Sequence, residues 1–99
     1  MSRAFYSDYV RHCLRFYTRH ESPKFFRTES DKLNWNACDE VFKTLSDDEK
    51  ELLYEIYRSA DTLADNIYVT SESRDIPQED IWSLIARIEN RIAKKRGIL

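Results

Sequence analysis

Glycine and proline are scarce in this sequence, which has one glycine and two prolines among its 99 residues. Tight β-hairpins depend on glycine for their turns, so a β-sandwich or barrel of many short strands is disfavoured. The same scarcity excludes the glycine-rich phosphate loops of nucleotide-binding proteins and the EF-hand calcium loop. Hydrophobic residues make up 41% and aromatic residues 13%, a composition typical of globular proteins. The sequence therefore predicts a globular all-α protein.

Apolar residues recur at helical spacing in five segments, which predicts five helices. We expect them at 3–19, at about 30–45, from 47 to about 59, at 61–73 and from 77 to about 95. The length permits one domain, so we expect a single compact unit over residues 1–99. Its first part, 1–44, holds aromatic N-terminal helices, and its second part is 45–99. The residues expected to be buried are Tyr9, Leu14, Val41, Phe42, Leu53, Ile56, Ile81, Ile85 and Ile88.

Three positions indicate where helices begin or end. Ser46 and Glu49 form an S-x-x-E capping box directly before an apolar run, which predicts a helix start at about residue 47. Ser30 has a residue type favoured at the N-cap, so we expect it to begin the second helix. Gly97, the only glycine, follows three basic residues and is expected to cap the C-terminus of the last helix.

The two cysteines, Cys13 and Cys38, lie at positions that match the apolar periodicity. The N-terminal segment has charged residues within its apolar pattern and does not resemble a secretion signal, which favours a reducing, cytoplasmic location and two buried thiols. His12, Cys13 and His20 lack the paired spacing of a zinc site, so we expect no metal and no cofactor. No run of 18 apolar residues is present, so we expect no membrane span.

No arrangement of a nucleophile with a base is apparent in the sequence, and no G-x-S-x-G motif is present. The acidic pairs Asp47/Asp48 and Glu79/Asp80 fall in expected first helical turns, where negative charge is favoured by the helix dipole. Acid–base catalysis by paired carboxylates requires burial, and these positions are expected to be exposed. We therefore expect a protein that is not an enzyme.

Charge is segregated along the chain. Residues 1–33 carry a net charge of +3, residues 34–80 a net charge of −9, and residues 81–99 a net charge of +4. A basic end beside an acidic middle is typical of proteins with a nucleic-acid or polymerase partner, or of a domain with two complementary surfaces. Ordinary charged helix surfaces are the plainer interpretation.

The segment 45–99 combines a capped helix that opens LSDDEKELL with an Ile-Pro-x-x-x-Ile turn and a long final helix that ends AKKRG. This order resembles the helix-turn-helix of sigma-70 region 4, and in particular the small sigma-like transcriptional regulators of phages and mobile elements of Gram-positive bacteria. The residues that match the two motifs are Leu45, Ser46, Glu49, Lys50, Ile76, Pro77 and Ile81. The resemblance implies a DNA-binding protein associated with transcription, whose last helix is a recognition helix.

Six residues of the last helix are therefore candidate DNA contacts. Gln78 and Ser83 lie near its start and could meet base edges. Four cations at positions i, i+4, i+7 and i+8 fall within an arc of about 100° beside the isoleucines and could contact phosphates. This basic stripe consists of Arg87, Arg91, Lys94 and Lys95. For Lys94 and Lys95 the alternative explanation is that positive charge is favoured at the C-terminus of a helix by the helix dipole.

The start of the expected recognition helix favours a second function. Residues 61–80 contain six acidic residues and one arginine, and Glu79 and Asp80 stand where DNA would approach. The alternative is a small helical adaptor, a degenerate helix-turn-helix that binds a protein partner such as RNA polymerase rather than double-stranded DNA.

Overall fold

The computed structural model describes residues 5–19, 26–59 and 61–98 of the chain. These residues form five α-helices and no strand, so the all-α prediction is confirmed. The helices are α1 (Ser7–Arg19), α2 (Glu29–Phe42), α3 (Asp47–Arg58), α4 (Leu63–Arg74) and α5 (Gln78–Arg96). The second helix ends three residues before its expected end, because residues 43–45 form a turn. The first helix begins at Ser7, later than expected, because Phe5 and Tyr6 form a turn; residue 3 lies outside the described residues.

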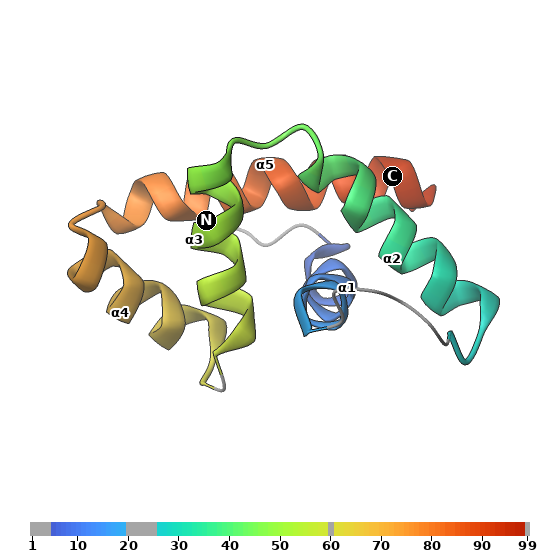
Figure 1. The fold of residues 1–99 in the computed structure, drawn as a ribbon, viewed down its shortest axis with the longest axis horizontal. Coiled ribbons are helices and arrows are strands. Elements are labelled where there is room, and N and C mark those ends of the chain that lie inside the picture. Colours follow the sequence, from blue (N-terminus) through green and yellow to red (C-terminus); the bar gives the residue numbers. More distant parts are fainter. Residues whose placement is uncertain (1–4, 20–25, 60, 99) are drawn as a thin grey trace.

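The longest helix, α5, runs along the length of the molecule, with α4 and α2 toward its opposite ends (Figure 1). It packs against α1, α2 and α4. The first helix lies in the middle and also contacts α2 and α3, while α3 packs on α4. Residues from both parts of the sequence thus share one hydrophobic core. Within the described residues, no helix has the length and apolar character needed to cross a membrane.

The core is close to the predicted one. Eight of the expected residues are at most 2% exposed: Leu14, Val41, Phe42, Leu53, Ile56, Ile81, Ile85 and Ile88. Both cysteines are buried and form no disulfide, as expected.

The prediction for Tyr9 is wrong, since this side chain is 40% exposed. The buried face of α1 runs through Val10, Cys13, Leu14 and Tyr17, so the row that contains Tyr9 is buried only from Cys13 onward. Two adjoining apolar rows of α1 both contribute to the core, and periodicity alone does not show which of their residues lies at its edge. Tyr9 lies at the edge, where its hydroxyl donates a hydrogen bond to Asn34 Oδ1 over 3.1 Å, because a phenol near the core requires a polar partner.

The capping box at the start of α3 is confirmed. The Ser46 hydroxyl accepts a hydrogen bond from the Glu49 backbone N–H at 3.2 Å, and Glu49 Oε1 accepts one from the Ser46 backbone N–H at 3.0 Å. Gly97 also caps α5 as predicted, with a φ of 79° that lies in the left-handed region. Because residues with a β-carbon are strained there, glycine suits this position.

The N-cap of α2 differs from the prediction. Thr28, not Ser30, has the extended backbone of an N-cap, and its hydroxyl accepts a hydrogen bond from the Asp31 backbone N–H at 3.1 Å. Both residues have a capping hydroxyl, so the sequence offers two starts that differ by half a turn. The earlier start is the one that the folded chain uses, and it leaves Ser30 exposed within the first turn.

These caps give a direct test of the helix boundaries. We expect Ser46→Ala to lower the free energy of unfolding by about 1 kcal/mol, because one backbone N–H of α3 loses its acceptor. Thr28→Ala should have a similar effect for the same reason, whereas Ser30→Ala should change stability by less than about 0.5 kcal/mol. Urea denaturation followed by circular dichroism measures all three. A larger loss for Ser30→Ala than for Thr28→Ala would contradict the assigned start of α2.

Candidate nucleic-acid interface

The turn between α4 and α5 consists of Asp75, Ile76 and Pro77. Asp75 has a φ of 54° and a ψ of 47°, a left-handed conformation that ends α4. The Ile76 backbone N–H donates to the Ser71 carbonyl at 3.1 Å, and the Ser71 hydroxyl donates to the Ile76 carbonyl at 2.5 Å. A three-residue connection between two packed helices is the length found in helix-turn-helix motifs.

The start of α5 presents polar and acidic side chains to solvent. Gln78, Glu79, Asp80 and Ser83 are all exposed, whereas Ile81 is buried in the core. Glu79 and Ser83 are four residues apart on a helix, so they share one face. Gln78 lies five residues before Ser83, about 140° around the helix. Gln78 and Ser83, the two candidate base-reading residues, therefore face different directions, and the Glu79 carboxylate lies beside Ser83.

A shallow groove of about 340 Å³ lies between the start of α3 and the first half of α5. Its apolar lining residues are Leu52, Ile76, Ile81 and Leu84. The polar residues along it are Glu49, Asp80, Ser83 and Arg87. The groove is thus lined by Ser83, a candidate base-reading residue, and by Arg87 of the basic stripe. The carboxylates of Glu49 and Asp80 line it as well.

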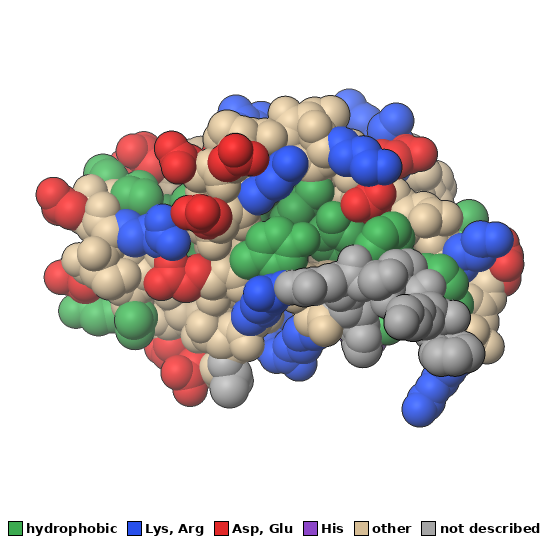
Figure 2. Space-filling view, viewed as in Figure 1, with side chains coloured by type: hydrophobic (Ala, Val, Ile, Leu, Met, Phe, Trp, Pro, Cys, Tyr) green, Lys and Arg blue, Asp and Glu red, His purple; other side chains and the backbone are tan. Residues whose placement is uncertain are grey.

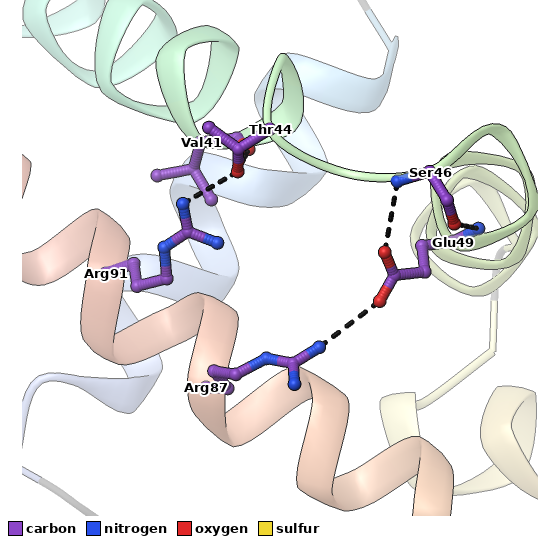
Figure 3. A network of polar contacts seen from close by, with 6 residues as sticks. All are labelled: Val41, Thr44, Ser46, Glu49, Arg87 and Arg91. Atoms are coloured by element: carbon purple, nitrogen blue, oxygen red, sulfur yellow. Dashed lines mark hydrogen bonds and ion pairs between the residues drawn. The ribbon is translucent and has the colours of Figure 1, made fainter.

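The basic stripe on α5 is largely occupied by contacts within the chain. The Arg87 guanidinium lies 3.2 Å from Glu49 Oε2, and the Arg91 guanidinium donates to the Thr44 hydroxyl at 2.7 Å (Figure 3). Lys95 Nζ lies 3.5 Å from Glu40 Oε2. Lys94 is exposed and forms no ion pair with any of the described residues. Three of the four predicted phosphate contacts therefore point toward α2, α3 and the turn between them.

Glu49 is the centre of this polar network. One of its carboxylate oxygens belongs to the capping box and the other to the ion pair with Arg87 (Figure 3). The hydrogen bond from the Ser46 backbone lowers the pKa of Glu49 below its ordinary value, and the charges of Arg87 and Arg91 lower that pKa further. The capping role was predictable from the S-x-x-E spacing. The contacts with α5 were not, because 38 residues separate Glu49 from Arg87.

Buried thiols offer little reactivity. Burial raises the pKa of Cys13 from 9.0 to about 11 and raises the pKa of Cys38 further. A thiol reacts as a nucleophile in its deprotonated form, so both groups are inert near neutral pH. Across the described part of the chain, no three His, Cys, Asp or Glu side chains are grouped so that they could hold a metal ion. His20, one of the residues considered for zinc, lies outside the described residues.

The lowered pKa of Glu49 predicts a pH dependence of stability. A carboxylate with a lowered pKa in the folded state stabilises that state above its unfolded pKa, and this stabilisation is lost as the pH falls through the folded value. We therefore expect the difference in unfolding free energy between wild type and Glu49→Gln to shrink from about pH 6 to about pH 3. Glu51→Gln, at an exposed position of the same helix, is the control. A constant difference across this range would contradict the interpretation.

The thiol chemistry gives a second test. At about pH 8, a colorimetric disulfide reagent should react with the native protein far more slowly than with the unfolded chain, because the folded thiols are buried and protonated. Cys13→Ser and Cys38→Ser variants identify which thiol reacts first. Rapid reaction of either thiol in the folded protein would show that the core around it opens readily.

Comparison of the chain with protein-family models, with curated proteins and with solved structures found no match. The features of the molecule that bear on function are the α4–turn–α5 unit, the basic stripe with its contacts inside the chain, and the acidic start of α5.

Proposed function

We propose that this chain is a non-enzymatic helical interaction domain that binds a protein partner. The observation that carries the proposal is the occupation of the basic stripe. Arg87 and Lys95 each form an ion pair within the chain, and Arg91 donates to the Thr44 hydroxyl, so two of the four charges of the stripe are balanced internally. A domain in which half of these cations are paired internally, and in which residues 61–80 are acidic, is better suited to a protein than to a polyanion.

The acidic start of α5 supports the same proposal. Residues 61–80 carry a net charge of −5, and Glu79 and Asp80 are exposed at the helix end that a DNA-binding helix-turn-helix directs into the major groove. Most of the affinity of a DNA-binding protein comes from neutralised phosphates. If Arg87 turned to a phosphate, Glu49 would lose its partner and would itself repel the DNA.

DNA binding in transcription is the second candidate function. The three-residue turn and the exposed parts of the stripe favour it, since the side chains of Arg87 and Lys95 remain 61% and 56% exposed despite their ion pairs. In this alternative, Gln78 and Ser83 meet base edges, and Arg87, Arg91, Lys94 and Lys95 contact phosphates. The sequence resemblance to sigma region 4 also makes RNA polymerase the first protein partner to test under the main proposal.

Fluorescence anisotropy with a labelled DNA duplex distinguishes the two functions. Under the proposal, we expect no measurable binding at about 50 mM salt, a condition that favours electrostatic association. A pull-down from bacterial lysate should then retain its protein partner after nuclease treatment. Glu79→Gln with Asp80→Asn should still bind no duplex, and circular dichroism confirms that the variant folds.

Binding of the DNA duplex would contradict the proposal. Duplex binding whose log K falls with log salt by about 0.9 per phosphate contact would favour the DNA alternative. In that case, Arg87→Glu with Arg91→Glu should weaken binding and reduce the salt slope by roughly two units. Loss of every captured protein after nuclease treatment would also contradict the proposal.

A further inference from the structure

The side of α4 that faces away from the core carries large apolar side chains. Tyr68 is 55% exposed and Val69 is 60% exposed. Asp65 and Glu72 lie on the same side, because positions i, i+3, i+4 and i+7 of a helix share a face. We call these four residues the α4 outer face. These adjacent aromatic and β-branched side chains leave apolar surface on a well-formed helix that is available to a partner.

The rotation of α4 is fixed by its opposite side. Ile67 is fully buried there, and Asn66 is 4% exposed. The Asn66 amide nitrogen donates to the Ile56 carbonyl at 3.0 Å and to the Asp61 carbonyl at 3.1 Å. Turning α4 to bury Tyr68 would break these hydrogen bonds and leave buried polar groups without partners. The outer face is therefore exposed because the fold requires it.

The charge around this face is negative and uncompensated. Arg74, the only cation between residues 61 and 80, forms an ion pair with Glu55 of α3. No described side chain forms an ion pair with Asp65 or Glu72. Figure 2 shows acidic side chains gathered at the end of the molecule where α4 and the start of α5 lie, with hydrophobic side chains exposed among them.

We propose that the α4 outer face docks a basic amphipathic helix of a partner protein, one with aliphatic residues along a stripe and Lys or Arg on both sides of it. A helix suits this surface because side-chain ridges of one helix pack into the grooves of another. Apolar contacts would cover Tyr68 and Val69, and flanking cations would pair with Asp65 and Glu72, as charged positions do beside the seam of a coiled coil. Opposite charge favours this partner and excludes a nucleic acid. This inference rests on the proposed protein-binding function and names the surface that serves it.

Two synthetic helical peptides test the proposal. Both have the same leucine stripe, but one has lysine and the other glutamate at the flanking positions. We expect the lysine peptide to bind the full chain and to shift amide signals of α4 in a ¹⁵N–¹H NMR titration. The glutamate peptide should bind at least about tenfold more weakly, and added salt should reduce the difference. Absence of binding by the lysine peptide up to about 1 mM would overturn the proposal.

Variants locate the binding. Tyr68→Ser with Val69→Ser should weaken binding of the lysine peptide at least about tenfold, with little change in melting temperature because both side chains are already exposed. Leu33→Ser, at a 44% exposed position of α2, is the matched control and should bind normally. Asp65→Lys with Glu72→Lys should reverse the preference between the two peptides. Equal loss of binding in the control, or NMR shifts confined to other helices, would overturn the assignment of this face.

Two further outcomes are separable. Wild type and the double variant Tyr68→Ser with Val69→Ser could capture the same protein equally well after nuclease treatment. In that case the proposed protein-binding function stands, and its assignment to the α4 outer face is contradicted. Sedimentation could instead show that the chain self-associates and that the same double variant abolishes this self-association. The α4 outer face would then bind a second copy of the chain, and the proposal of a basic partner helix would be overturned.

Discussion

A buried carboxylate, Glu89, sets the position of α1 on α5. Its side chain is 4% exposed and accepts a hydrogen bond from Arg11 Nε at 3.2 Å. A buried charge without a partner costs several kcal/mol, so the two helices must dock with these residues opposite each other. The Arg11 guanidinium also lies over the Trp82 ring, and Asn90 donates to the Tyr6 hydroxyl at 3.1 Å. These contacts place the apolar face of α1 in the core.

The remaining helices are arranged around this pair through an aromatic cluster. Tyr17 of α1 packs its ring against Phe42 of α2 and Tyr54 of α3, and its hydroxyl donates to Asp39 at 3.0 Å. Arg58 of α3 donates to the Thr18 carbonyl at 2.6 Å. The aromatic residues of the N-terminal part therefore join three helices into one unit. With that unit in place, α3 supports α4, and α4 leads through a short turn into α5.

This arrangement also distributes the charge. Contacts of Arg87, Arg91 and Lys95 hold the second half of α5 to α2, α3 and the turn between them. Arg87 and Lys95 thus pair with acidic residues from the middle of the sequence, whereas Arg91 contacts a hydroxyl. No such contact reaches Asp65 or Glu72 among the described ion pairs, so the end of the molecule that contains α4 stays acidic. The basic C-terminal segment is therefore partly balanced by acidic residues of α2 and α3, and the acidic residues 61–80 lie at the other end of α5.

Local patterns in the sequence determined the helices, the capping box at Ser46 and the cap at Gly97, because these depend on residues within one or two turns. Most of the core followed from helical periodicity. Only the tertiary structure decided that Tyr9 lies at the edge of the core while Cys13 and Tyr17 of the same row are buried, since that depends on how α2 and α5 pack on α1. It also decided the roles of Arg87 and Arg91. Their partners are 38 and 47 residues away, and the sequence gives no measure of which distant side chains the packing brings within reach.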